Sequence, residues 1–122
     1  MGYRILVIED NPTNLELMTY LLRAFGHETM TSESGNPGVE IARVKHPDLI
    51  ACDVHLPDMD GYETMREIRK DPRLRSLPIL ALTAKAMKGD REKCLEAGAS
   101  DYIAKPVNTE QLLSLLRIWL HR

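Results

Sequence analysis

Residues 5–12 of the chain are Ile5-Leu6-Val7-Ile8-Glu9-Asp10-Asn11-Pro12, an apolar run that passes directly into polar residues and a proline. Four consecutive apolar and mostly β-branched residues predict a strand buried on both faces, as the strands of parallel sheets are. Asn11 is a favourable N-cap, and Pro12 suits the first position of a helix. Apolar residues then recur at helical spacing as far as Gly26, so this region predicts a strand followed by a helix.

The same strand-then-helix pattern recurs along the rest of the chain. The connections between successive strands are long enough for crossovers, which predicts one parallel sheet with helices on both faces. The second strand is short and polar, which favours an edge position. We expect strands at Ile5–Ile8, Glu28–Ser32, Leu49–Cys52, Pro78–Leu82 and around Tyr102–Ile103, and helices that begin near Pro12, Asn36, Gly61, Met87 and Asn108.

Composition limits the class of protein. The chain has 122 residues, of which 43% are hydrophobic and 28% charged, so residues 1–122 are expected to form a single soluble domain. Sixteen basic and eighteen acidic residues give a net charge of -2, and the scattered basic residues argue against direct nucleic-acid binding. No apolar stretch is long enough for membrane insertion, and Cys52 and Cys94 form no CxxC pair. We therefore expect two reduced thiols and a cytoplasmic location.

Polar side chains follow the predicted strands where each one ends. Glu9 and Asp10 follow the first strand, Asp53 the third, Thr83 the fourth and Lys105 the fifth. In an open parallel sheet these ends meet at one edge, where ligands bind. Three carboxylates repel one another unless they hold a hard cation, and Mg²⁺ accepts carboxylates together with phosphate oxygens. A lysine and a hydroxyl suit the oxygens of a phosphoryl group, so this edge predicts a site for Mg²⁺ and a phosphoryl group.

The motifs at these positions resemble the receiver domain of two-component response regulators. They are Glu9-Asp10, the segment from Asp53 to Gly61, Thr83-Ala84 and Lys105-Pro106, in the family's order and spacing. The resemblance covers essentially the whole chain, and the segment from Met87 to Tyr102 is most similar to receivers of hybrid sensor kinases and single-domain cell-cycle regulators. It implies a flavodoxin/CheY-like α/β fold, a doubly wound five-stranded parallel sheet with strand order 2-1-3-4-5 and five flanking helices.

The resemblance also implies which residues accept the phosphoryl group and bind the metal. Asp53 would be the phosphoacceptor, attacking a phosphohistidine on a sensor histidine kinase or a histidine phosphotransfer protein. Mg²⁺ would be held by Asp10, by the Asp53 carboxylate, by the backbone carbonyl of His55 and, through water, by Glu9. Mn²⁺ is a second cation of suitable chemistry.

Four more residues receive roles from the resemblance. Lys105 would pair with Asp53 and then with the phosphoryl oxygens, and the peptide bond between Lys105 and Pro106 would be cis. Thr83 would move its hydroxyl to the phosphate, and Tyr102 would be the coupled switch aromatic. Together these roles imply a phosphorylation-dependent signalling switch that catalyses only its own phosphorylation and dephosphorylation. Because the chain ends soon after its last helix, we expect its output to be a change in protein binding rather than an effector domain.

An enzyme is the alternative function. Mg²⁺-dependent phosphohydrolases of the haloacid-dehalogenase type also use an aspartyl nucleophile on a parallel sheet. They have a second aspartate two residues after the nucleophile, where this chain has His55, and usually a cap insertion for which 122 residues leave no room. The switch is therefore the favoured interpretation, while the cognate kinase, the output partner, the phosphoryl lifetime and the oligomeric state stay open.

Several residues near the site also have plain structural interpretations. Asp58 and Asp60 form a D-x-D pattern, but just before Gly61 they are expected to shape the loop and cap the third helix. The His55 imidazole is expected to point outward. Tyr102 could be a core aromatic instead of a switch, and Trp119 could be partly buried packing or a partner contact.

Overall fold

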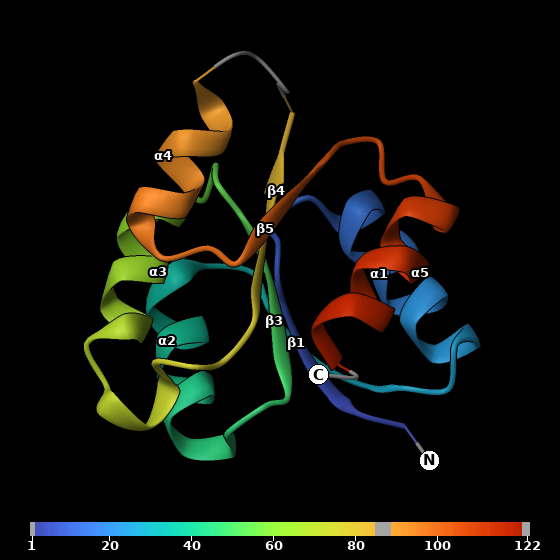
Figure 1. Ribbon diagram of the computed structural model, residues 1–122, viewed down its shortest axis with the longest axis horizontal. Helices are drawn as coiled ribbons and strands as arrows, with labels where there is room; N and C mark the ends of the chain where they lie inside the picture. Colours follow the sequence, from blue (N-terminus) through green and yellow to red (C-terminus); the bar gives the residue numbers. More distant parts are fainter. Residues whose placement is uncertain (1, 85–88, 121–122) are drawn as a thin grey trace.

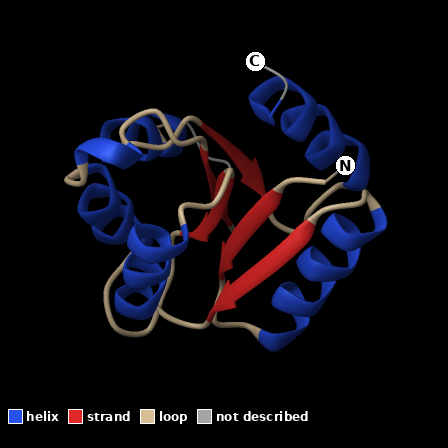
Figure 2. Ribbon diagram, turned by 90° about the horizontal axis from the view of Figure 1, so that it is seen from below, coloured by secondary structure: helices blue, strands red, loops and turns tan. Residues whose placement is uncertain are grey.

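The computed structural model describes residues 2–84 and 89–120. These residues form a five-stranded parallel sheet in the order β2-β1-β3-β4-β5, with helices on both faces (Figures 1 and 2). The predicted α/β class and strand order are confirmed. The strands are β1 Arg4–Ile8, β2 Glu28–Ser32, β3 Leu49–Asp53, β4 Ile79–Thr83 and β5 Asp101–Ala104; the helices are α1 Pro12–Ala24, α2 Gly35–Lys45, α3 Gly61–Arg69, the short 3₁₀ helix η1 Pro72–Leu74, α4 Asp90–Ala97 and α5 Thr109–Leu120.

The continuous apolar strands are explained by two cores, one on each face of the sheet. Successive residues of a strand point to opposite faces, so Ile5 and Val7 pack toward α1 and α5, whereas Leu6 and Ile8 pack toward α2, α3 and α4. Figure 1 shows these two helix layers on either side of the sheet. Burial on both faces is the physical reason that the sequence of β1 shows no polar alternation.

Parallel pairing brings the strand ends to one edge. Ile8 pairs with Cys52, Asp53 with Leu82, and Thr83 with Ala104. From β1 the chain crosses to β2 on one side, and it then returns to β3 on the other side of β1. The carboxyl ends of β1 and β3 therefore flank the position where parallel α/β sheets bind ligands. The polar residues that follow β1 and end β3 therefore lie next to each other.

Element boundaries differ from the sequence prediction in a few places. The helix α2 begins at Gly35 rather than Asn36, after Ser34 as N-cap. Strand β4 begins at Ile79, because Pro78 has no N–H to donate. The 3₁₀ helix at Pro72–Leu74 was not predicted. The expected start of the fourth helix at Met87 falls outside the described residues, and the described part of that helix is Asp90–Ala97.

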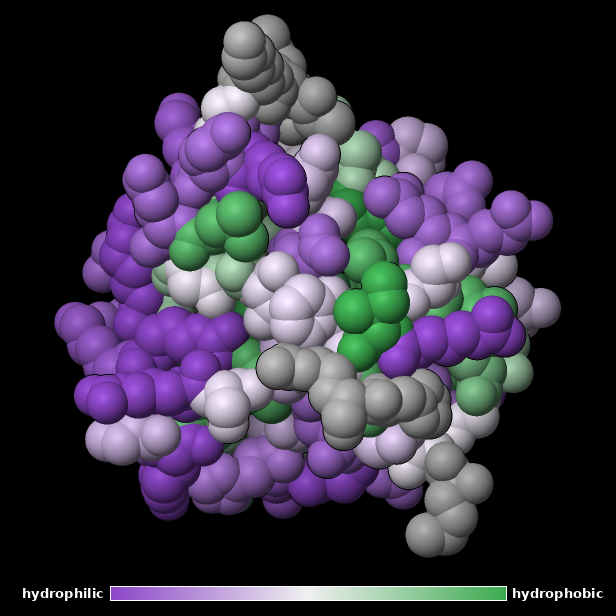
Figure 3. All heavy atoms as spheres, viewed as in Figure 1, coloured by the Kyte–Doolittle hydropathy of each residue, from purple (hydrophilic) through white to green (hydrophobic). Residues whose placement is uncertain are grey.

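The surface is mostly hydrophilic, and both cysteine thiols are unpaired, as the sequence predicts. Hydrophilic side chains cover most of the face shown in Figure 3, and hydrophobic ones show on α4 and between β5 and α5. Within residues 2–84 and 89–120, no helix is long and apolar enough to cross a membrane. Cys52 and Cys94 are free and buried, so the expectation of two unpaired thiols is confirmed.

Candidate functional site

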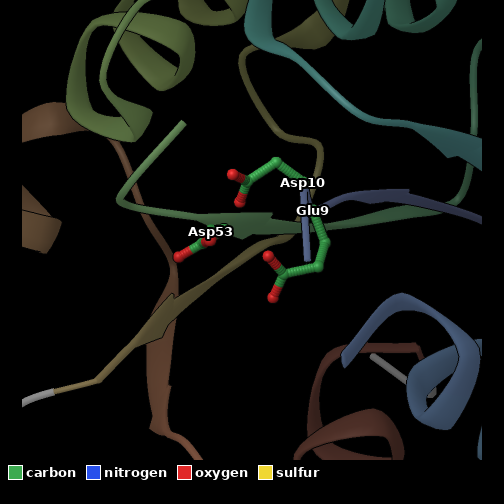
Figure 4. Close-up of side chains that lie close together, drawn as sticks. All are labelled: Glu9, Asp10 and Asp53. Carbon is green, nitrogen blue, oxygen red and sulfur yellow. The ribbon is translucent and has the colours of Figure 1, made fainter. Parts of the chain in front are cut away.

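Three carboxylates converge at the carboxyl edge of the sheet. Glu9 and Asp10 directly follow β1, and Asp53 is the last residue of β3. One oxygen from each carboxylate lies within 4.8 Å of the other two, and Figure 4 shows the three groups around one space. Glu9 is 0% exposed and Asp53 2% exposed, whereas Asp10 is open to solvent. Water can therefore reach the cluster from the Asp10 side.

Lys105 brings a positive charge to the site. Lys105 follows β5, and its backbone N–H donates to the carbonyl of Thr83 at 2.7 Å. Its Nζ lies 3.1 Å from Glu9 Oε1 and 3.1 Å from Asp53 Oδ1. The peptide bond between Lys105 and Pro106 is cis. The ammonium thus contacts both buried carboxylates.

Burial and neighbouring charges shift the pKa values of Glu9 and Lys105. Burial, with the neighbouring Asp53 carboxylate, raises the pKa of Glu9 to about 7. Burial alone would lower the pKa of Lys105, but Asp53 and Glu9 together raise it. One ammonium balances only one of the two buried carboxylates, so the described site has a negative excess that favours a cation.

Close backbone packing holds Asp53 in place. The N–H of Val54 donates to the carbonyl of Leu82 at 3.0 Å, and the N–H of Gly61 donates to the carbonyl of Val54 at 2.8 Å. A Cβ on Gly61 would lie 2.1 Å from the Asp53 carbonyl oxygen, so only glycine fits at the start of α3. The N–H of His55 donates to Asp53 Oδ1 at 3.2 Å, and the His55 side chain is exposed.

The two residues expected to act as a switch lie on neighbouring strands. Thr83 is the last residue of β4 and is 2% exposed, at the same edge as the carboxylates. Tyr102 lies on β5, where it pairs with Ala81 of β4, and it is half-buried against the core on the α2–α4 side. Tyr102 as a whole therefore keeps part of its surface accessible to solvent.

The two aspartates of the D-x-D pattern cap different helices. Asp60 is the N-cap of α3 and accepts from the N–H of Glu63 at 2.8 Å, as predicted. The prediction that Asp58 caps the same helix is wrong, because Asp58 accepts from the N–H groups of Gly35 at 2.7 Å and Asn36 at 2.8 Å. Asp58 thus caps α2, whose N-cap Ser34 makes no side-chain cap bond. Local sequence carries no signal for a cap supplied from another loop.

Trp119 takes a packing position at the other end of the sheet. Its indole Nε1 donates to Asp101 Oδ2 at 3.3 Å, and the ring packs partly buried against the core beside α1 and α5. The hydrogen bond ties the end of α5 to the start of β5, as expected for partly buried packing.

Fold and site together define the class of protein. This is an open α/β domain of the flavodoxin type. Its acidic cluster lies at the switch point of the sheet, and the lysine that follows the last strand contacts two of the carboxylates.

The comparisons with known proteins identify the family within that class. A family model described as the response regulator receiver domain matches residues 5–117. The polar-differentiation response regulator DivK of Brucella ovis is 37% identical over 120 residues, which cover 98% of each chain. The receiver domain of sensor histidine kinase PA1611 from Pseudomonas aeruginosa, crystallised with a magnesium ion in its active site cleft, has a TM-score of 0.93 and 41% identity over 100% of both chains. Chemotaxis protein CheY4 of Vibrio cholerae has a TM-score of 0.92 and 27% identity over 98% of this chain and 100% of its own.

The chain therefore belongs to the response regulator receiver domains of two-component signalling. This membership implies interaction with a histidine kinase or a phosphotransfer protein. The phosphohydrolase alternative receives no support from the family match or from these relatives.

Proposed function

We propose that this chain is a phosphorylation-dependent switch in which Asp53 accepts a phosphoryl group from a phosphohistidine. One observation carries the assignment: Asp53, which ends the central strand β3, has its carboxylate 3.1 Å from the Lys105 ammonium and beside Glu9 and Asp10. The donor is the histidine of a sensor kinase or of a phosphotransfer protein. Because such donors act in the cytoplasm, we place this chain there.

The acidic cluster suits a magnesium ion. Asp10 and Asp53 would supply carboxylate oxygens, the backbone carbonyl of His55 would supply a third protein oxygen, and Glu9 would contribute through water. Hard oxygen donors with solvent access on one side are what Mg²⁺ prefers, and Mn²⁺ accepts the same set. The magnesium named for the PA1611 receiver supports this choice. When bound, the ion neutralises charge on the carboxylates and on the transferring phosphoryl oxygens.

Each side chain then has a defined task in the transfer. An Asp53 oxygen attacks the phosphorus, the bond from phosphorus to the histidine nitrogen breaks, and its electron pair returns to the imidazole. Lys105 and the Thr83 hydroxyl hold the equatorial oxygens, where charge collects in a loose transition state. In dephosphorylation, a separate reaction, water attacks the phosphorus, the Asp53 carboxylate leaves, and inorganic phosphate is released. The chain thus acts only on its own phosphoryl group and turns over no other substrate.

The aspartyl phosphate adds nearly two negative charges to the site, which draw the Thr83 hydroxyl toward it. Tyr102, half-buried two residues before the end of β5, then changes its packing, and a partner protein binds the altered surface around it. Driving such a switch from mostly off to mostly on takes about 5.5 kcal/mol, and two or three charge-assisted hydrogen bonds approach this.

Acetyl phosphate tests the assignment without a kinase. With Mg²⁺ present, intact mass should show one added phosphoryl group that is acid-stable and base-labile, and chelation of the ion should suppress it. The Asp53→Asn variant should take up none, since its amide cannot attack. Labelling of that variant at the wild-type level would mean that another residue is the acceptor, and multiple turnover of a small phosphoester would favour an enzyme instead.

A further inference from the structure

The loop between β3 and α3, residues 54–60, contains the carbonyl that the proposed function assigns to the metal. Its two ends are fixed by backbone contacts, since Val54 bonds to Leu82 and Gly61 bonds back to Val54. Leu56 packs against the core from inside the loop. The far side of the loop, at Asp58 and Met59, contacts a different element.

That element is the first turn of α2. The two oxygens of Asp58 accept from the consecutive N–H groups of Gly35 and Asn36 at 2.7 and 2.8 Å. These bonds provide the side-chain cap of the helix, because Ser34 at its N-cap position makes no side-chain cap bond. The same bonds lower the pKa of Asp58, as expected for a carboxylate that is held in its ionised form.

Packing reinforces the contact. Gly35 is buried, and a Cβ built on it would lie 2.5 Å from Met59 Cγ and 2.5 Å from Thr64 Oγ1. The start of α2, the loop and α3 therefore touch without room for a methyl group. A shift of the loop would break both Asp58 bonds, because their donors belong to a helix that packs on the core.

We infer that Asp58 is a positioning residue for the metal site: by bonding the loop to the first turn of α2, it holds the backbone carbonyl of His55 at the place where Mg²⁺ binds. The inference rests on the proposed function, since it needs a metal ion beside Asp53. Only Leu56 and Pro57 lie between His55 and Asp58 in the same short loop, so we expect the cap and the carbonyl to move together. Groups that orient metal ligands typically change affinity by about 10–100-fold when they are removed.

Mg²⁺ affinity of the full chain measures this effect, by calorimetry or from the amide shifts of residues 54 and 55. Asp58→Ala removes both cap bonds and one charge. Asp60→Asn is the matched control, because it removes one charge from the same loop while asparagine still caps α3. Asp71→Ala is the stability control, since Asp71 caps η1 beyond the far end of α3. We expect about a tenfold loss of affinity for Asp58→Ala and less than about twofold for both controls.

Reciprocal coupling gives a second readout that needs only the wild-type protein. If the cap favours metal binding, metal binding must favour the cap by the same factor. Saturating Mg²⁺ should therefore slow hydrogen exchange at the amides of Gly35 and Asn36, and no such slowing is expected for Ala24 on α1.

The outcomes separate the two proposals. Equal affinities for Asp58→Ala and Asp60→Asn, or unchanged exchange at Gly35 and Asn36 on metal binding, would overturn the positioning role while leaving the phosphoacceptor assignment standing. A wild-type protein that binds no Mg²⁺ and takes up no phosphoryl group would instead overturn the proposed function, and the positioning role with it.

Discussion

The Nζ atom of Lys105 lies 3.1 Å from Oε1 of Glu9, a carboxylate with no exposed surface, and the two residues are 96 positions apart in the sequence. The same ammonium contacts Asp53, so one cation pairs with two buried acids. Glu9 Oε2 in turn accepts from the N–H of Asn11 at 3.2 Å. Lys105 therefore stabilises the metal-free domain as well as serving the proposed transfer.

Replacing Lys105 with methionine should destabilise the protein in a pH-dependent way. Without the ammonium, Glu9 and Asp53 repel each other unless one takes a proton. We expect a loss on the order of 2 kcal/mol near pH 8, below the usual cost of breaking a fully buried pair because Lys105 reaches solvent. Near pH 5 the loss should be smaller. Urea denaturation at both pH values measures this difference.

Lys70→Met is the control for that experiment. Lys70 also contacts a carboxylate, that of Glu67, but the pair is on the surface of α3. Its removal should change the free energy of unfolding little at either pH. Equal losses for the two variants would show that burial of the Lys105 contacts has no energetic importance.

The raised pKa of Glu9 predicts an unusual pH dependence for the metal-free protein. Its pKa in the folded state is about 7 against an ordinary 4.5, so between these values the folded protein binds more protons than the unfolded chain. The stability that Glu9 contributes is therefore complete below about pH 4.5 and is lost as pH rises through about 7. Glu9→Gln cannot titrate, so the difference in unfolding free energy between wild type and variant isolates this group.

Magnesium should reverse that trend, because it binds the ionised carboxylates. With Mg²⁺ saturating, the wild type should gain stability from about pH 5 to about pH 7, and affinity should rise over the same range. An unfolding free energy of the wild type that runs parallel to that of Glu9→Gln at every pH, with and without metal, would contradict the raised pKa.

The sequence predicts the fold well because the physical signals are local. The apolar run of β1 and the Asn11-Pro12 start of α1 each lie within a few residues, and alternation along a buried strand fixes both cores. The short polar strand β2 was predicted at the edge and lies there. Boundaries such as the start of α2 shift by one residue because capping depends on which tertiary donors are nearby.

Features that depend on distant contacts could not be predicted in this way. Because the carboxyl ends of parallel strands meet at one edge, the sequence predicts that Glu9, Asp53 and Lys105 lie there. It does not predict the 3.1 Å contacts of Lys105 with the two acids or the raised pKa of Glu9. The cap that Asp58 provides for α2 is formed across 22 and 23 positions, and nothing within α2 or the loop signals it. Both features arise only when the sheet register is set.

The tight packing at Gly61 predicts a large effect of a single methyl group. In Gly61→Ala the new Cβ would lie 2.1 Å from the carbonyl oxygen of Asp53 and 2.4 Å from Val54 Cα, and both are backbone atoms that cannot rotate away. We expect a loss of roughly 3 kcal/mol or more, from overpacking and from displacement of the end of β3. Phosphoryl uptake from acetyl phosphate should fall in the same variant, since the Asp53 carboxylate moves with its backbone.

Gly26→Ala tests whether space or backbone conformation is responsible. Gly26 has φ of +92°, but a Cβ there meets nothing within 4 Å. Its substitution should therefore cost only about 1 kcal/mol of backbone strain and leave phosphoryl uptake unchanged. A smaller loss for Gly61→Ala than for Gly26→Ala would show that the close approach to Asp53 relaxes easily.

Arg69 joins three segments at the end of the sheet away from the site, and its removal should loosen them together. Its guanidinium donates to the carbonyls of Gly98 at 2.9 Å and Leu74 at 2.7 Å, although burial lowers its pKa. Arg69→Met keeps the aliphatic packing against Gly98 but removes the guanidinium bonds to these carbonyls, which should cost on the order of 2 kcal/mol. The stability of Arg69→Lys, with one donor group in place of the planar fork, should fall between those of the wild type and Arg69→Met.

Hydrogen exchange gives a second measurement. In Arg69→Met it should become faster at Ala99, whose N–H bonds to the carbonyl of Cys94 in α4. Arg66→Met, three residues earlier on the exposed face of α3, should alter neither quantity, so matching losses at both arginines would refute the role of Arg69.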